Sequence, residues 1–146
     1  MTLDSIGNVV TDRIRSNGQV GVGEYVDPTS NPQLTRRFWS SRWDGESGLT
    51  QAPGTTGTWA LVKEGSQFWR FPPSAHGDAL PVQTIQPGLD DEGFDPQFAV
   101  DDTYLYAIDH ATTTLFVYRT DRRGPQRPLS SQRVVGQGVI GVAVGP

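Results

Sequence analysis

The sequence predicts an all-β fold, and three features of its 146 residues support this prediction. The chain carries 17 glycines and 11 prolines, which disfavour long helices. Short runs of β-branched and aromatic residues alternate with turn formers about every 8–14 residues, a spacing typical of sandwiches and barrels. Four tryptophans argue against disorder. We therefore expect one antiparallel domain over 1–146, sandwich or barrel-like, with eight to ten strands and long Gly/Pro-rich loops.

A hairpin over residues 9–26 is the first expected element. Ser16-Asn17-Gly18 interrupts this stretch, and Asn-Gly favours the positive φ angles of a tight hairpin turn. The β-branched residues before it also favour a strand. A short helix is the competing interpretation, because four apolar residues recur at helical spacing: Leu3, Ile6, Val10 and Ile14.

A strand over residues 36–43 is expected after a loop of turn formers at 27–32. Because side chains alternate along a strand, its two faces have different composition. One face carries Phe38, Ser40 and Arg42, and the other carries Arg37, Trp39, Ser41 and Trp43. A glycine-containing loop follows at 44–57.

The clearest hairpin joins residues 58–62 to residues 67–71 through a turn at 63–66. We expect Trp59 and Leu61 to share one core face with Trp69 and Phe71. Pro72-Pro73 ends the second strand, because proline donates no hydrogen bond to a neighbouring strand.

The second half of the chain is expected to hold another hairpin and two single strands. The hairpin joins 104–109 to 114–120. A further strand is expected at 80–86, where Pro81 implies either an edge position or the start of the strand. A Val/Gly-rich strand is expected at 132–144. Between them lie an acidic loop at 86–98 and a basic loop at 121–131.

The predicted core is built from the apolar residues of these strands. Only one side of each strand is expected to face it, so either Phe68 or Trp69 should lie outside. The predicted core residues are Trp59, Leu61, Phe68, Trp69, Phe71, Tyr104, Tyr106, Ile108, Leu115, Val117, Val142 and Val144.

The hairpin at 101–120 resembles part of a β-propeller blade. A propeller needs several blades of about 40 residues each. The chain has room for three at most and shows one, so a propeller is not the predicted fold.

The composition limits the possible functions. The chain has no cysteine, which excludes disulfides, thiolate zinc sites and cysteine nucleophiles. Its net charge of −4 is a poor match for nucleic-acid binding, which favours a basic surface. The first residues show no signal peptide, so we expect synthesis in the cytoplasm. The longest apolar stretch, 134–145, is too short and too interrupted to cross a membrane.

Two charged segments are the main candidates for protein contacts. Six carboxylates lie within residues 90–102. We expect a solvated loop or a polar protein contact there, and we consider calcium binding and glycoside hydrolysis as less favoured alternatives. Arginines gather at 122–133, and their charge complements the acidic segment. The interface candidates are Asp90, Asp91, Glu92, Asp95, Arg122, Arg123, Arg127 and Arg133.

Three patterns that suggest chemistry lack the context that the chemistry needs. Residues 136–141 match G-x-G-x-x-G, but five residues remain after them, too few for the helix of a dinucleotide-binding unit. His76 and His110 are in no metal-binding spacing. Ser74, His76 and Asp78 are too close in sequence to resemble a catalytic triad. We therefore expect no enzymatic activity, cofactor or metal.

The sequence favours a structural protein that is a subunit of a larger assembly, with copies of itself and other subunits as partners. The end segments 1–33 and 132–146 hold Val/Gly-rich strands whose free edges would be hazardous without a neighbour. Small cysteine-free β-domains of this kind resemble bacteriophage virion components, namely capsid decoration, neck or tail proteins. The alternative is a carbohydrate-binding β-sandwich that uses exposed tryptophans, with Trp39 and Trp43 as glycan candidates.

Overall fold

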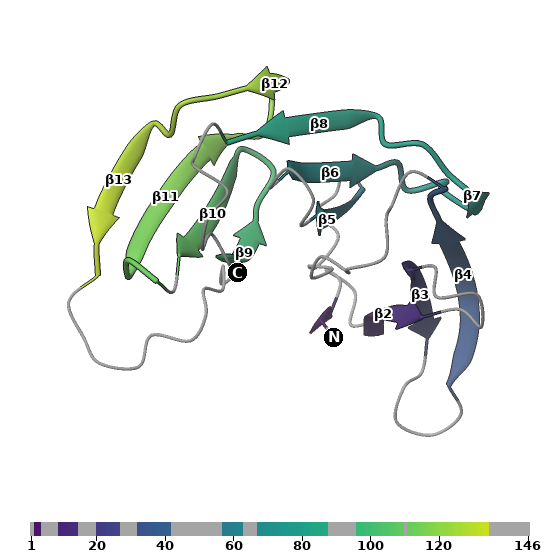
Figure 1. Ribbon diagram of the computed structural model, residues 1–146. Helices are drawn as coiled ribbons and strands as arrows, with labels where there is room; N and C mark the ends of the chain where they lie inside the picture. Colours follow the sequence, from purple (N-terminus) through teal and green to yellow (C-terminus); the bar gives the residue numbers. More distant parts are fainter. Residues whose placement is uncertain are drawn as a thin grey trace.

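The structure, a computed structural model, describes residues 2–3, 9–14, 20–26, 32–41, 57–62, 67–87, 96–109 and 111–134. All regular elements in these residues are β-strands, so the expected all-β class is confirmed (Figure 1). They number thirteen, and three of them (β1, β7 and β12) have only two residues. Within this part of the chain there is no helix long and apolar enough to cross a membrane.

The N-terminal sheet has the strand order β1-β2-β3-β4-β7. Its strands are β1 (Thr2–Leu3), β2 (Val9–Ile14), β3 (Val20–Val26), β4 (Gln33–Trp39) and β7 (Gly77–Asp78). Ile14 lies opposite Val20, which confirms the expected pairing of 9–14 with 20–26 and excludes a helix there. The predicted turn at Ser16-Asn17-Gly18 lies outside the described residues, as do positions 42 and 43 of the strand expected at 36–43.

The middle sheet has the strand order β12-β8-β6-β5. Its strands are β5 (Thr58–Val62), β6 (Gln67–Phe71), β8 (Gln83–Gln86) and β12 (Gly124–Pro125). The hairpin β5–β6 has the predicted bounds. The strand expected at 80–86 begins three residues later, because Pro81 has no N–H to donate and the first ladder residue follows it.

The C-terminal sheet has the strand order β13-β11-β10-β9. Its strands are β9 (Pro96–Val100), β10 (Tyr104–Asp109), β11 (Thr114–Arg119) and β13 (Ser130–Arg133). The predicted hairpin β10–β11 is confirmed, and its second strand ends one residue earlier than expected. Residues 96–98, which were expected to close the acidic loop, instead begin a strand whose Phe98 is fully buried.

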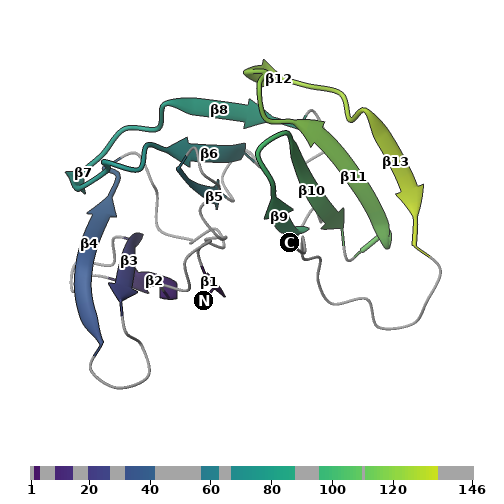
Figure 2. The same ribbon diagram turned by 180° about the vertical axis from the view of Figure 1, so that it is seen from behind.

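The three sheets stand side by side in an arch, and both views show the same order (Figures 1 and 2). In the middle and C-terminal sheets the first strand, β5 or β9, lies on the concave side of the arch, and later strands lie towards the convex side. Two short strands join neighbouring sheets. β7, from the connection between β6 and β8, pairs in parallel with β4, and β12, which follows β11, pairs in parallel with β8.

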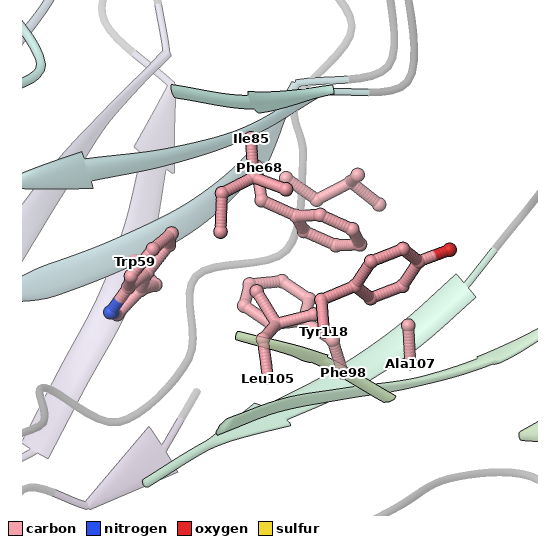
Figure 3. Packing of buried hydrophobic residues seen from close by; sticks show 8 residues of the cluster. Trp59, Phe68, Ile85, Phe98, Leu105, Ala107 and Tyr118 are labelled. Carbon is pink, nitrogen blue, oxygen red and sulfur yellow. The ribbon is translucent and has the colours of Figure 1, made fainter. Parts of the chain in front are cut away.

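The middle sheet is buried on both faces, because an apolar cluster lies on each side of it. The cluster shared with the N-terminal sheet contains Val22, Phe38, Ala60, Val62, Trp69, Phe71 and Ala75. The cluster shared with the C-terminal sheet contains Trp59, Leu61, Phe68, Ile85, Phe98, Leu105, Ala107 and Tyr118 (Figure 3). Every residue of β5 is buried as a result.

This double burial corrects the predicted pattern of the hairpin β5–β6. Leu61 lies opposite Phe68 and Ala60 lies opposite Trp69, so Leu61 and Trp69 face different neighbouring sheets. The expectation that they share one face was wrong, since it placed the facing pairs one residue out of register. Phe68 and Trp69 are both buried, because each side of their strand has its own core.

In the C-terminal sheet, the more deeply buried face is opposite to the one that carries the predicted core residues. Leu105, Ala107 and Tyr118 are buried against the middle sheet. Of the five predicted core residues here, Ile108 is buried, whereas the other four are half-buried: Tyr104, Tyr106, Leu115 and Val117. Val142 and Val144 lie outside the described residues.

Candidate functional site

The segment that follows β11 is fastened to the middle sheet by one buried amide. Nε2 of Gln83, on β8, donates to the carbonyl oxygens of Thr120 at 2.5 Å and Arg122 at 2.7 Å. Gln126 Nε2 donates to the same carbonyl of Arg122 at 3.0 Å. The two bonds from Gln83 hold the backbone of the segment after β11 against the start of β8, and the Gln126 bond lies within that segment.

Arg70 lies beside this anchor. It is opposite Gln83 on β8 and opposite Trp59 on β5, so the three residues cross the middle sheet in one row. The guanidinium carbon of Arg70 is 5.8 Å from the centroid of the Trp59 ring, which is a cation–π contact. Burial, and then the positive charge of Arg123, lowers the pKa of Arg70.

Two buried N–H donors in this row have no acceptor within the described part of the chain. They are Nε of Arg70 and Nε1 of Trp59, and Trp59 itself is fully buried. In Figure 3 the indole nitrogen points away from the apolar cluster. A buried donor without an acceptor costs about 1–3 kcal/mol, so this row is unusual in a folded domain.

Arg36 shows what a paired arginine looks like in the same fold. It lies between the N-terminal and middle sheets, where Nε donates to Glu24 at 2.8 Å. Its NH2 donates to Oγ1 of Thr58 at 2.9 Å, and its NH1 donates to the carbonyl oxygen of Pro73 at 2.6 Å. The guanidinium of Arg36 thus joins two sheets and has an acceptor on each side.

The four predicted basic candidates have different surroundings in the structure. All of them are exposed: Arg122, Arg123, Arg127 and Arg133. Arg123 acts electrostatically on Arg70, and Arg122 provides the carbonyl bound by Gln83. Arg133 lies in β13, opposite Thr114 on the convex side of the C-terminal sheet.

The predicted acidic candidates Asp90, Asp91, Glu92 and Asp95 lie outside the described residues. At the end of the same acidic stretch, Asp101 closes the turn between β9 and β10. Burial raises the pKa of Asp101, but hydrogen bonds from the backbone N–H groups of Tyr104 and Thr103 and from the Tyr106 hydroxyl outweigh burial and lower it. Among the described residues, no group of three or more His, Asp or Glu side chains could hold a metal ion.

Of the two glycan candidates, Trp43 lies outside the described residues and Trp39 is half-buried at the end of β4. Trp39 lies on the opposite face of the strand from the buried Phe38, together with the exposed Arg37. The predicted two faces of this strand are therefore present, and its core face holds Phe38 and Ser40.

Ser74, His76 and Asp78 do not form a chain of hydrogen bonds. Nδ1 of the exposed His76 is 3.0 Å from the carbonyl oxygen of Ser74, so this nitrogen carries the proton. Oδ1 of Asp78 accepts from the backbone N–H of Ser41 at 2.8 Å. His76 and Asp78 thus bond to backbone groups and not to each other. His110 lies outside the described residues.

Sequence reasoning missed Arg70 and Gln83. Arg70 was assigned only to a strand, yet it is the one charged residue in a run of aromatics, Gln67–Phe71. A charge on a strand that is buried on both faces must meet an acceptor or a ligand. That signal was present, but it required knowing that both faces are covered.

Comparisons with protein-family models, with curated proteins and with solved structures found no match to this chain.

Proposed function

We propose that this chain is a non-catalytic structural subunit that builds a larger assembly by adding sheets to its arch. The observation that carries the proposal is the outer face of the C-terminal sheet. Tyr104, Tyr106, Leu115 and Val117 lie there and are half-buried. Elsewhere in the fold, apolar sheet faces pack on a neighbouring sheet, which buries them almost completely.

Neighbouring sheets of the arch pack on each other through apolar faces, and this packing is sandwich-like, as the sequence predicts. Its curvature, with early strands inside and late strands outside, is also how blades are placed in a radial array of 4–8 sheets. Three sheets are half of a six-sheet ring. A second copy of this chain would supply the other half, and the C-terminal sheet of each copy would meet the N-terminal sheet of the other.

The other predicted contact regions support the same role. They are the end segments 1–33 and 132–146 and the exposed arginines of the basic segment. The assembly that we favour is a bacteriophage-type virion, in which this small cysteine-free β-domain would be a capsid decoration, neck or tail protein. The test of this narrower proposal is whether the chain co-purifies at a fixed stoichiometry with intact particles.

The assembly proposal is tested by the mass of the purified chain in solution. Light scattering at several concentrations should give a dimer, and Val117→Arg, on the outer face, should give a folded monomer by circular dichroism. Leu129→Arg is the control, because Leu129 is 52% exposed and precedes β13. A monomeric wild-type chain at all concentrations contradicts self-assembly.

Carbohydrate binding is the second candidate function, and the placement of Trp39 favours it. A half-buried indole beside the exposed Arg37 combines a stacking surface with a hydrogen-bond donor. Glycan-array binding that Trp39→Ala abolishes, with an unchanged melting temperature, would support it. An array without any bound glycan would dismiss it.

A further inference from the structure

The row of Trp59, Arg70 and Gln83 carries an inference that is independent of the assembly proposal. We propose that Arg70 and Arg123 form a binding site for an oxyanion, the carboxylate or phosphate group of a ligand, where the segment after β11 meets the middle sheet. Three observations support this site: a buried donor without an acceptor among the described residues, the anchored backbone beside the second arginine, and the charges and side chains around the site.

Nε of Arg70 is a buried donor without an acceptor among the described residues. A guanidinium has five N–H donors, and folded proteins pair most of those that leave water. Arg36 follows this rule, with a carboxylate, a hydroxyl and backbone carbonyls around it. Arg70 is also half-buried, but its buried Nε has no hydrogen-bond partner among the described residues. An oxyanion provides an acceptor for this N–H group.

The backbone beside Arg123 is held by a side chain of the middle sheet. Gln83 holds the carbonyl of the preceding residue, Arg122, at 2.7 Å, so the backbone next to Arg123 is anchored before any ligand arrives. The positive charge of Arg123 then acts on Arg70. An anion that binds both arginines removes this repulsion, so two like charges that act on each other favour a bound anion.

The charges near the site leave room for an anion. The carboxylate nearest to Arg123 along the chain, Asp121, is already held by both Nε and NH2 of Arg119, at 2.7 and 2.5 Å. The buried indole of Trp59 covers one side of Arg70. An anion bound at this place is screened less than on an open surface.

The experiment titrates the purified full chain with inorganic phosphate and, separately, with citrate, at constant ionic strength set by sodium chloride. Tryptophan fluorescence reports binding, because Trp59 contacts Arg70, and the melting temperature gives a second readout. We expect saturable binding of at least one of the two ions, and the tighter ion shows whether phosphate or carboxylate is preferred.

Matched variants separate a site from general attraction of anions. Arg70→Met, which keeps an apolar stem, and Arg123→Ala should each weaken binding at least about tenfold. Arg127→Ala removes the same charge from an exposed position nearby and should change binding less than about twofold. If Arg70→Met fails to fold, the anion binding of Arg123→Ala and Arg70→Lys is compared with that of Arg127→Ala instead. Equal losses in Arg123→Ala and Arg127→Ala, or no saturable binding of either ion, overturn the proposal.

Discussion

Arg36 and Glu24 lie directly opposite each other on β4 and β3, with NH2 of the arginine 2.7 Å from Oε2 of the glutamate. Both side chains are largely buried, at 15% and 17% exposure. Because Arg36 also reaches Thr58 and the carbonyls after β6, it joins the N-terminal and middle sheets as one polar unit.

Arg36→Met should lower the free energy of unfolding by about 3–5 kcal/mol, because it leaves the carboxylate of Glu24 buried without its partner. Urea denaturation followed by tryptophan fluorescence measures this loss. Arg37→Met is the control, since Arg37 is exposed on the same strand, and it should stay within about 0.5 kcal/mol of the wild type. Equal stability of the two variants would show that the Arg36 network contributes nothing.

Gly57→Ala should be the most harmful glycine substitution among the described residues. Gly57 has φ of 130°, and a Cβ atom there would collide with the backbone carbonyl oxygen of Phe71. We expect a loss of about 3 kcal/mol or more, measured by chemical denaturation. At Gly77, φ is 59° and nothing lies near the added Cβ, so Gly77→Ala should cost only about 1–2 kcal/mol. The reverse order would contradict the close approach at Gly57.

Tyr118→Phe should leave the protein as stable as the wild type or make it more stable by up to about 1 kcal/mol. The Tyr118 hydroxyl is buried and has no partner among the described residues, so its removal abolishes a desolvation cost. Tyr106→Phe provides the contrast, because its hydroxyl donates to Asp101 at 3.1 Å, and it should lose about 1 kcal/mol. Denaturation midpoints distinguish the two, and a clear loss in Tyr118→Phe would reveal an acceptor for that hydroxyl.

Asp101 should contribute stability that disappears in acid. Its folded pKa is lowered, since the turn hydrogen bonds outweigh the opposing effect of burial. A lowered carboxyl pKa gives stability that is complete above the unfolded value of about 3.9 and is lost as pH falls through the folded pKa. Asp101→Asn should therefore be less stable than the wild type at pH 6, with the gap closing below about pH 4. A gap that stays constant down to pH 2 would remove Asp101 from the acid response.

Local patterns in the sequence predicted the strands well where apolar residues stood between clear turns. The bounds of the hairpin β5–β6 and the existence of β10–β11 followed from such patterns. Burial was harder to predict, because Tyr104, Leu105 and Tyr106 are all apolar or aromatic and alternation alone does not choose a face. The choice depends on which neighbouring sheet arrives, which is a property of the whole fold.

The candidate oxyanion site could be predicted only in part. Arg122 and Arg123 stand out as a basic pair, but nothing local shows that Gln83, 39 residues before Arg122, holds their backbone. Arg70 looked like an ordinary strand residue until the middle sheet proved to be covered on both sides. Long-range pairing therefore decides which arginine is solvated and which has a buried N–H group without an acceptor among the described residues.

The two short strands that join neighbouring sheets also set an order for folding during synthesis. The outer edge of β4 is paired only when Gly77–Asp78 has left the ribosome, and the outer edge of β8 waits for Gly124–Pro125. Each of these edges therefore stays open to other chains until most of the following sheet has been made. A ribosome that paused after the middle sheet would leave the edge of β8 unpaired. Uninterrupted translation of the C-terminal sheet therefore protects the nascent chain from aggregation.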